Sequence, residues 1–253
     1  MMFMAMLKKE WTESFRSFKL MSVIIVFAIL GIMSPFIALL TPQILESALQ
    51  EEFAGFVFPE PTAHDAFVQF YSNINQMGLI IFVILFGSIL TNEFSRGTLV
   101  NLLTKGLRRD VVIHVKALFV LVVWTVSYAV AAVLTYFYTI YYWDEPLYQL
   151  FGALVTTWIF GVFIISIIFL ASVLFRNFIA VLSSVVVLLV VFFLLGIHPD
   201  VAEWLPTYLN GHNVEMLKDA KPFSDMWPAI GMTVGLSIVF YVLTILRFRR
   251  MEV

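Results

Sequence analysis

The sequence predicts an all-α integral membrane protein with six transmembrane helices. Of its 253 residues, 61% are hydrophobic and 13% are charged, whereas soluble proteins have about 45–50% apolar and about 25% charged residues. The mean hydropathy is +0.96, and the apolar residues form runs long enough to cross a bilayer core of about 30 Å. We expect one transmembrane domain over residues 1–253, with spans at 20–40, 70–91, 111–140, 150–175, 178–197 and 228–246.

The segment before the first span, residues 1–19, has the pattern of an amphipathic helix. Its large apolar residues recur every three or four positions with charged residues between them; they are Met4, Leu7, Trp11, Phe15 and Phe18. Such a helix is suited to lying in the headgroup region of a bilayer, and an ordinary basic flank of the first span is the alternative. The apolar run that follows is longer than the h-region of about 7–15 residues in a signal peptide, so we expect no cleavage there.

Two long polar segments separate spans on one side of the predicted bundle. Residues 41–76 carry acidic side chains but no Lys or Arg, so we expect a loop there, although the second span is expected to begin near Phe67 because its apolar run is short. Residues 198–227 are rich in proline and aromatic residues, and the stretch PDVAEWLPTYL is a candidate for a short re-entrant helix. Arg176 and Asn177 alone connect the fourth and fifth spans, which predicts an antiparallel hairpin.

Basic and acidic residues are distributed unequally between the two sides. With six spans, both termini, the 92–110 loop and Arg176 lie on one side, together with every Lys and Arg except Lys218 and Lys221. Most Asp and Glu residues lie on the other side. Because cytoplasmic loops carry the excess of Lys and Arg, we expect both termini in the cytoplasm and the protein in the cytoplasmic cell membrane.

Residues that are absent exclude several kinds of chemistry. The sequence has no cysteine, which excludes disulfides, thiolate metal sites and cysteine nucleophiles. Its four histidines are scattered, and no Gly-rich loop ends in Gly-Lys-Ser/Thr, so we expect no metal, no bound nucleotide and no catalytic residue. No ionisable residue lies in the central part of a predicted span, where ion-coupled transporters keep such groups. A net charge of −2 gives no reason to expect a nucleic-acid partner.

The loop between the second and third spans, residues 92–110, combines a turn, a helix cap and a short apolar face. Gly97 permits a sharp turn, and Thr98 can cap a helix by accepting a bond from a free amide. The apolar face that follows has the spacing i, i+3, i+4, and its members are Leu99, Leu102 and Leu103. A capped, two-turn amphipathic helix between two spans indicates a docking element, and a helix that sits among lipid headgroups is the alternative.

The order of these elements resembles type-2 ATP-binding-cassette (ABC) exporter permeases. The loop motif reads E-x-x-R-G-T-L-x-x-L-L-T-x-G-x-R-R, and the matching residues are Glu93, Arg96, Gly97, Thr98, Leu99, Leu102, Leu103, Thr104, Arg108 and Arg109. The N-terminal helix is similar to the elbow helix of that family, and its corresponding residues are Leu7, Trp11, Phe15 and Phe18. Where the family often has Pro after Leu-Leu-Ser/Thr, this chain has Lys105 and Gly106, so the turn differs in sequence there.

The resemblance implies a permease that works with separate ABC ATPase subunits. Two permease copies, identical or different, would pair in the bilayer, and two ATPase subunits would hold ATP and Mg, so this chain would bind no cofactor and would not be an enzyme. The coupling residues implied in the 92–110 loop are Glu93, Phe94, Arg96, Gly97, Thr98, Leu99, Leu102 and Leu103. The three leucines would enter a groove on the ATPase, the threonine would cap the helix, and the glutamate and arginine would fix its angle.

The resemblance also places a pathway between the second and fifth spans of the two copies. The aromatic residues there are Phe82, Phe86, Phe192 and Phe193. An uncharged aromatic lining suits export of an amphipathic cargo, such as a peptide, a lipid-linked molecule or a drug-like compound, and the alternative is that these side chains face lipid. A secondary transporter or channel, and a non-transporting membrane sensor or scaffold, stay open as other functions.

Overall fold

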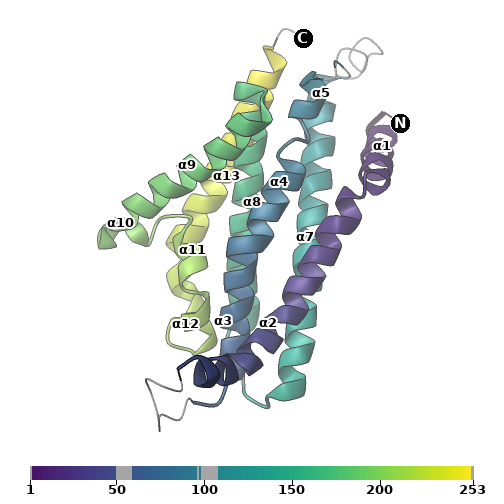
Figure 1. The fold of residues 1–253 in the computed structure, drawn as a ribbon. Helices are drawn as coiled ribbons and strands as arrows, with labels where there is room; N and C mark the ends of the chain where they lie inside the picture. The colour runs from purple at the N-terminus through teal and green to yellow at the C-terminus, as the bar shows by residue number, and fades with distance from the viewer. Residues whose placement is uncertain (1, 50–58, 96, 98–107, 252–253) are drawn as a thin grey trace.

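The computed structural model describes residues 2–49, 59–95, 97 and 108–251, and in this part of the chain it contains helices but no strand (Figure 1). The α-helices are α1 (Met2–Arg16), α2 (Lys19–Leu49), α3 (Ala63–Asn73), α4 (Leu79–Phe86), α5 (Thr91–Ser95), α7 (Arg109–Tyr142), α8 (Leu150–Phe175), α9 (Phe178–Leu195), α10 (Pro199–Ala202), α11 (Tyr208–Gly211), α12 (Asn213–Leu217) and α13 (Trp227–Arg249). A π-helical turn, η1 (Ile74–Gly78), joins α3 to α4, and a 3-10 turn, η2 (Phe223–Met226), precedes α13.

Six helical segments are long and apolar enough to cross a membrane, so the predicted all-α, six-span fold is confirmed. They are Lys19–Ile44, Ala63–Ser95, Arg109–Tyr142, Leu150–Phe175, Phe178–Leu195 and Phe223–Arg249. The fourth segment is 67% buried inside the molecule and the fifth is only 11% buried. The fourth span is therefore the centre of the bundle, and the fifth, α9, leans away from it at the periphery (Figure 1).

The loop expected over residues 41–76 is shorter than predicted: helix α2 continues into its first part, and the second span begins at Ala63, four residues before the expected start near Phe67. Helix α2 continues to Leu49, because residues 41–49 include good helix formers and a helix can extend beyond the apolar run. Helix α3 begins at Ala63, where Thr62 and Asp65 form a capping box: the Thr62 hydroxyl accepts from the Asp65 amide, and the Asp65 carboxylate accepts from the Thr62 amide at 2.9 Å. Polar composition alone therefore did not distinguish loop from helix at the two ends of this segment.

Two glycines allow neighbouring helices to approach closely. A Cβ atom on Gly31 would lie 2.5 Å from the carbonyl oxygen of Ala131, so α2 and α7 touch backbone to backbone at this point. Thr135 strengthens the contact, because its hydroxyl donates to the Gly31 carbonyl at 3.0 Å. On α8, a Cβ atom on Gly161 would lie 2.1 Å from the ring of Trp124, which is fully buried between α7 and α8.

Residues 198–227 form short helices that fold back against the spans. Helices α11 and α12 pack on α8, and α12 also contacts α3. Asn213 is buried there: its amide donates to the Thr157 hydroxyl at 2.7 Å, and its carbonyl oxygen accepts from Thr156 at 3.0 Å. Asn210 donates to Asn75, in the π-helical turn, at 2.6 Å. These hydrogen bonds attach the segment to the bundle at the end opposite α1 (Figure 1).

Candidate functional site

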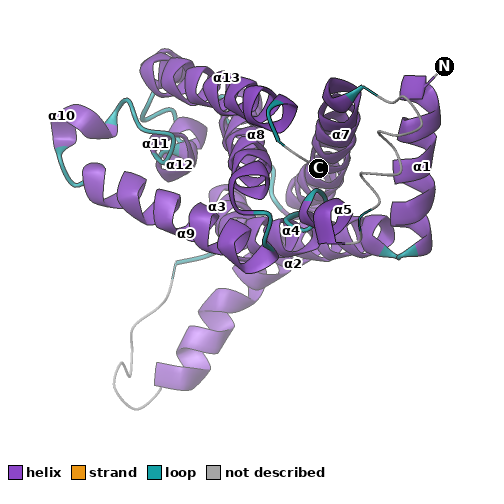
Figure 2. Cartoon of the chain, turned by 90° about the horizontal axis from the view of Figure 1, so that it is seen from above, coloured by secondary structure: helices purple, strands orange, loops and turns teal. Residues whose placement is uncertain are grey.

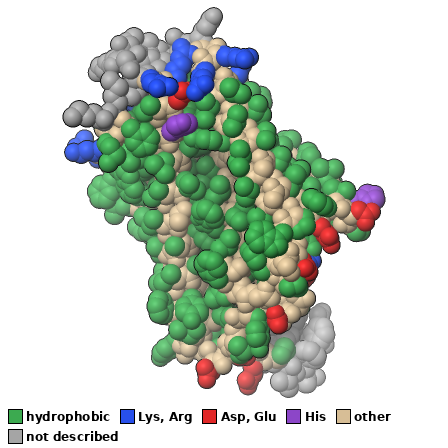
Figure 3. Space-filling view, turned by 180° about the vertical axis from the view of Figure 1, so that it is seen from behind, with side chains coloured by type: hydrophobic (Ala, Val, Ile, Leu, Met, Phe, Trp, Pro, Cys, Tyr) green, Lys and Arg blue, Asp and Glu red, His purple; other side chains and the backbone are tan. Residues whose placement is uncertain are grey.

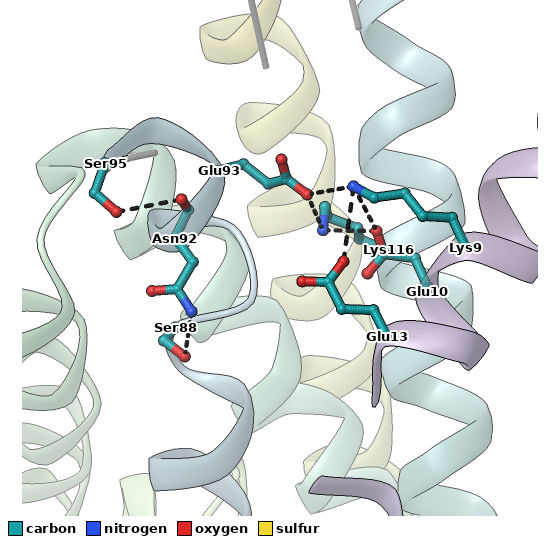
Figure 4. Close-up of polar contacts among 8 residues, drawn as sticks. All are labelled: Lys9, Glu10, Glu13, Ser88, Asn92, Glu93, Ser95 and Lys116. Atoms are coloured by element: carbon teal, nitrogen blue, oxygen red, sulfur yellow. Dashed lines mark hydrogen bonds and ion pairs between the residues drawn. The ribbon is translucent and has the colours of Figure 1, made fainter. Parts of the chain in front are cut away.

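Four charged side chains from three separate elements meet at the end of the bundle that carries α1 (Figure 4). Lys9 and Glu10 come from α1, Glu93 from α5 and Lys116 from α7. The Nζ atom of Lys116 lies 2.9 Å from Oε1 of Glu10 and 3.1 Å from Oε1 of Glu93, and Nζ of Lys9 lies 3.0 Å from the same Glu93 atom. We call these four residues the ion network.

The ion network is largely removed from solvent. Glu10, Glu93 and Lys116 are 3%, 6% and 2% exposed. Charges are costly to bury unless each has a partner of opposite sign and good geometry, and here each buried carboxylate contacts at least one ammonium group. The network therefore holds α1, α5 and α7 in one arrangement, and removing one buried member would leave the charge of another without its partner.

Lys9 lies at the edge of the network and stays charged. Burial lowers its pKa, but the hydrogen bond to Glu93 and the nearby carboxylates of Glu93, Glu10 and Glu13 outweigh burial and raise the pKa above its ordinary value. The Glu13 carboxylate lies 3.8 Å from Nζ of Lys9. Glu10, Glu13 and Glu93 thus bring three carboxylates together, and Lys9 and Lys116 contact all three, so the cluster has the character of an ion-pair network.

The face of α1 that contacts the bundle is distinct from most of the apolar face that was expected to lie among lipid headgroups. Its buried side chains are Met6, Glu10 and Ser14, at i, i+4 spacing. Of the residues expected to form the apolar face, Leu7 packs against the core, Trp11 lies edge-on to Phe119 at 5.4 Å, and the mostly exposed ones are Met4, Phe15 and Phe18. Seen from above, α1 runs along one side of the bundle (Figure 2), which leaves these exposed apolar residues accessible to lipid.

The predicted coupling residues fall into two groups. The Glu93 carboxylate contacts Lys116 of its own chain. The ring centroid of Phe94 lies 6.1 Å from that of Phe248 and 5.7 Å from the guanidinium carbon of Arg176. Gly97 has φ of 63°, the left-handed turn that favours glycine. The remaining coupling residues lie outside the described part of the chain; they are Arg96, Thr98, Leu99, Leu102 and Leu103.

The structure does not bring the four candidate pathway phenylalanines together. Phe82 and Phe86 are each 1% exposed and pack in the core, with ring centroids 5.3 Å from Trp124 and 6.3 Å from Phe119 respectively. The other two lie on α9: Phe192 contacts Phe163 at 5.7 Å, and Phe193 is 71% exposed. Phe193 lines an apolar groove of about 550 Å³ between α4, α8 and α9.

Sequence reasoning missed the role of Glu10 and Lys116 in the network. Glu10 lies in the same helical row as Met6 and Ser14, which was a weak signal of a buried face. Glu93 and Lys116 each stand next to an apolar run, on spans that are consecutive in the chain. Opposite charges at the adjoining ends of consecutive spans are the signal that could have suggested an ion pair.

Comparison with known proteins identifies the family. A family model described as ABC-2 family transporter protein matches residues 4–253. The chain is 25% identical over 256 residues to the Uncharacterized transmembrane protein YxlG of Bacillus subtilis (strain 168), and the alignment covers 98% of each chain. No solved structure matches the chain significantly. Permeases of this family are membrane subunits, generally non-catalytic, that work with ABC ATPase partners. Since the family match spans nearly the whole chain and the fold has six candidate spans, this multi-pass membrane protein belongs to the ABC-2 transporter family.

Proposed function

We propose that the chain is the permease subunit of an ABC exporter and that the ion network links its ATPase-docking loop to its spans. The observation that carries the proposal is the position of Glu93, which belongs to the network and lies four residues before the turn at Gly97. The segment that begins after this turn is the one expected to dock on the ATPase. A force applied to that segment would reach α1 and α7 through buried charges, and both helices pack against α2.

Docking itself is proposed for the amphipathic part of the loop. Leu99, Leu102 and Leu103 would enter a groove on each of two ATPase subunits, with Thr98 as the helix cap and Arg96 as a polar contact. ATP and Mg would be bound by those subunits, and their closure would rock the spans. Glu93 would act within the permease, because its carboxylate contacts Lys9 and Lys116 of its own chain.

The proposed orientation places both termini in the cytoplasm of a cell whose membrane the bundle crosses. Figure 3 shows Lys and Arg side chains gathered at one end of the molecule and most Asp and Glu side chains toward the other. The basic end carries α1 and the end of α13 (Figure 1). The positive-inside rule supports a cytoplasmic location for that end, and export of cargo toward the acidic end follows from the proposed mechanism.

A second permease copy would pair along the exposed side of α9. This helix is apolar, only 11% of it is buried, and the groove beside it is also lined by α4 and α8. A partner against this side would bury Phe193 and enclose an uncharged path suited to an amphipathic cargo. Phe82 and Phe86 lie inside the core of one chain, so they would support the wall of such a path from behind.

A scaffold or sensor is the alternative that one observation favours. The ion network stiffens the docking end of the molecule and does not itself need a pathway. A secondary transporter has less support, because in the described spans the buried ionisable groups Glu93 and Lys116 lie near span ends, away from the middle. Movement of cargo in proteoliposomes containing the permease and its ATPase would separate an exporter from a scaffold.

The deciding experiment is purification of the tagged chain in mild detergent, together with two loop variants. Leu102→Asp places a charge on the proposed docking face, and Asn101→Asp places the same charge one residue away, off the i, i+3, i+4 face. We expect an ATP-hydrolysing subunit to elute with the wild type and with Asn101→Asp but not with Leu102→Asp. If no ATPase elutes with the wild type, the permease proposal fails; if it also elutes with Leu102→Asp, the docking face is assigned incorrectly.

A further inference from the structure

We propose that the groove between α7, α8 and α13 binds an anionic phospholipid, with an acyl chain along the groove and the phosphate at a cluster of arginines. The groove has a volume of about 490 Å³. Six apolar side chains that line it are Leu118, Leu121, Trp158, Val162, Val234 and Ile238. It is separate from the ion network and from the groove beside α9, since α13 and α9 lie on opposite sides of α8 (Figure 2).

The length and lining of the groove suit an acyl chain. Its residues run from His114 to Leu121 on α7 and from Tyr241 to Val234 on α13. Seven residues of helix rise about 10 Å, which is most of the hydrocarbon depth of one leaflet, about 15 Å. Leu118 and Val234 are each 40% exposed, so the groove is open to lipid along its side.

The groove ends at a polar contact and then at a basic cluster. Nδ1 of His114 lies 2.7 Å from the Tyr241 hydroxyl, which joins α7 to α13 at the end of the apolar lining. One helical turn further along α7, the Asp110 carboxylate accepts from Nε and Nη2 of Arg249 at 2.7 and 2.8 Å. Arg109 donates to the Arg249 carbonyl at 3.0 Å and also to the Met251 carbonyl.

The charge at this end favours an anion. Arg108 also lies 3.6 Å from Asp110, so two arginines contact this aspartate, and Arg109 is held beside them by its bonds to the Arg249 and Met251 carbonyls. A guanidinium group has five N–H donors, and the Asp110 carboxylate takes two from Arg249, which leaves donors for a phosphate. Figure 3 shows the same arrangement on the back of the molecule, where Lys and Arg side chains gather above a broad hydrophobic surface.

An anionic lipid matches this arrangement better than a zwitterionic lipid or a second copy of the chain. Each basic residue near a membrane surface increases binding of anionic lipid by about five-fold, whereas a zwitterionic headgroup also brings a cation to the arginines. A second copy would bring its own basic cluster if it docked by the same face, and like charges would meet. We therefore assign the groove to a phospholipid with net negative charge.

Native mass spectrometry of the purified full chain, exchanged against equal amounts of phosphatidylglycerol and phosphatidylcholine, tests the assignment. We expect the wild type to retain phosphatidylglycerol at least about five-fold over phosphatidylcholine. Val234→Trp fills the groove without changing charge and should lose the retained lipid. Val239→Trp is the matched control, because Val239 is 50% exposed on the same helix but does not line the groove; it should behave as the wild type. Arg109→Gln combined with Arg249→Gln should bring the preference close to one.

Three results would overturn the assignment. The first is equal retention of the two lipids by the wild type, and the second is an unchanged preference in Val234→Trp. The third is a smaller oligomer in Val234→Trp but not in Val239→Trp, which would make the groove an interface between copies. The tryptophan pair keeps the test valid if the double arginine variant does not fold, because neither tryptophan variant alters the Asp110–Arg249 contact.

Discussion

Nζ of Lys116 lies 3.1 Å from Oε1 of Glu93, and this buried ion pair joins the start of the third span to the end of the second. The same ammonium group also contacts Glu10, from the N-terminal helix, at 2.9 Å. Lys116 therefore contacts two buried carboxylates that come from two other elements. The loop proposed to dock on an ATPase begins beside this contact. A change that weakens the contact should therefore also weaken the transmission of force from the loop to the spans.

Removing Lys116 should be strongly destabilising. Lys116→Met keeps most of the side-chain volume but leaves Glu10 and Glu93 buried without their central partner, and breaking a buried ion pair in this way costs about 3–5 kcal/mol. The thermal unfolding midpoint in detergent should fall clearly below that of the wild type. The midpoint can be followed by the loss of monodisperse protein on size-exclusion chromatography after heating.

The matched control for this variant removes all three buried charges together. Combining Lys116→Met with Glu10→Gln and Glu93→Gln leaves no buried charge unpaired, since Lys9 is 39% exposed and keeps Glu13 at 3.8 Å. Neutral replacement of all the buried members of an ion network is often close to neutral. We expect the triple variant to unfold at a higher temperature than Lys116→Met alone. Equal midpoints for the two variants would show that packing around Lys116, rather than its charge, dominates.

The contact between Gly31 and Ala131 gives a steric prediction. In Gly31→Ala the new Cβ would approach the Ala131 carbonyl oxygen to 2.5 Å, and overpacking of this kind costs about 1–3 kcal/mol. The higher helix propensity of Ala offsets at most about 1 kcal/mol of this cost. Gly231→Ala is the control, because nothing lies within 4 Å of its Cβ position; it should be neutral or slightly stabilising. A Gly31→Ala variant as stable as the control would contradict the close packing of α2 and α7.

Lys9 gives a prediction for pH. Its pKa is raised above the ordinary 10.5, so its stabilising effect is fully present below that value and is lost only as the pH rises through the higher pKa of the folded state. The difference in unfolding midpoint between wild type and Lys9→Met should therefore be the same at pH 7 and pH 9. The difference should be modest, because the Lys9 side chain is 39% exposed and solvent screens its interactions. A difference that shrinks between these two pH values would mean that Lys9 loses its proton in this range.

The six spans could be predicted because each depends on a local property, the length of an apolar run. The ion network could not, because it depends on which face of α1 turns toward α7. Apolar periodicity indicated the face with Trp11 and Phe15 as the one that meets lipid headgroups, and that face is partly or largely exposed; nothing in the periodicity identified the face that packs on α7. In a membrane protein an apolar face can lie against lipid, so apolar periodicity does not distinguish lipid-facing from protein-facing sides. On α1 the polar residue Glu10 lies on the side that packs against the bundle.

The hydrogen bonds of Asn213 predict how the segment between the last two spans is held. Asn213→Leu would leave the Thr157 hydroxyl without the amide donor that lies 2.7 Å from it, deep in the bundle, and loss of such a partner costs about 1–3 kcal/mol. Because α12 packs on α8 at this point, the effect should be local opening of residues 198–222, measured as faster amide hydrogen exchange there with little change in α2 and α7. Glu215→Gln is the control, since Glu215 is an exposed neighbour on the same short helix, and it should exchange as the wild type does. Unchanged exchange in Asn213→Leu would mean that apolar packing alone, through residues such as Met216 and Leu217, fixes the segment to the spans.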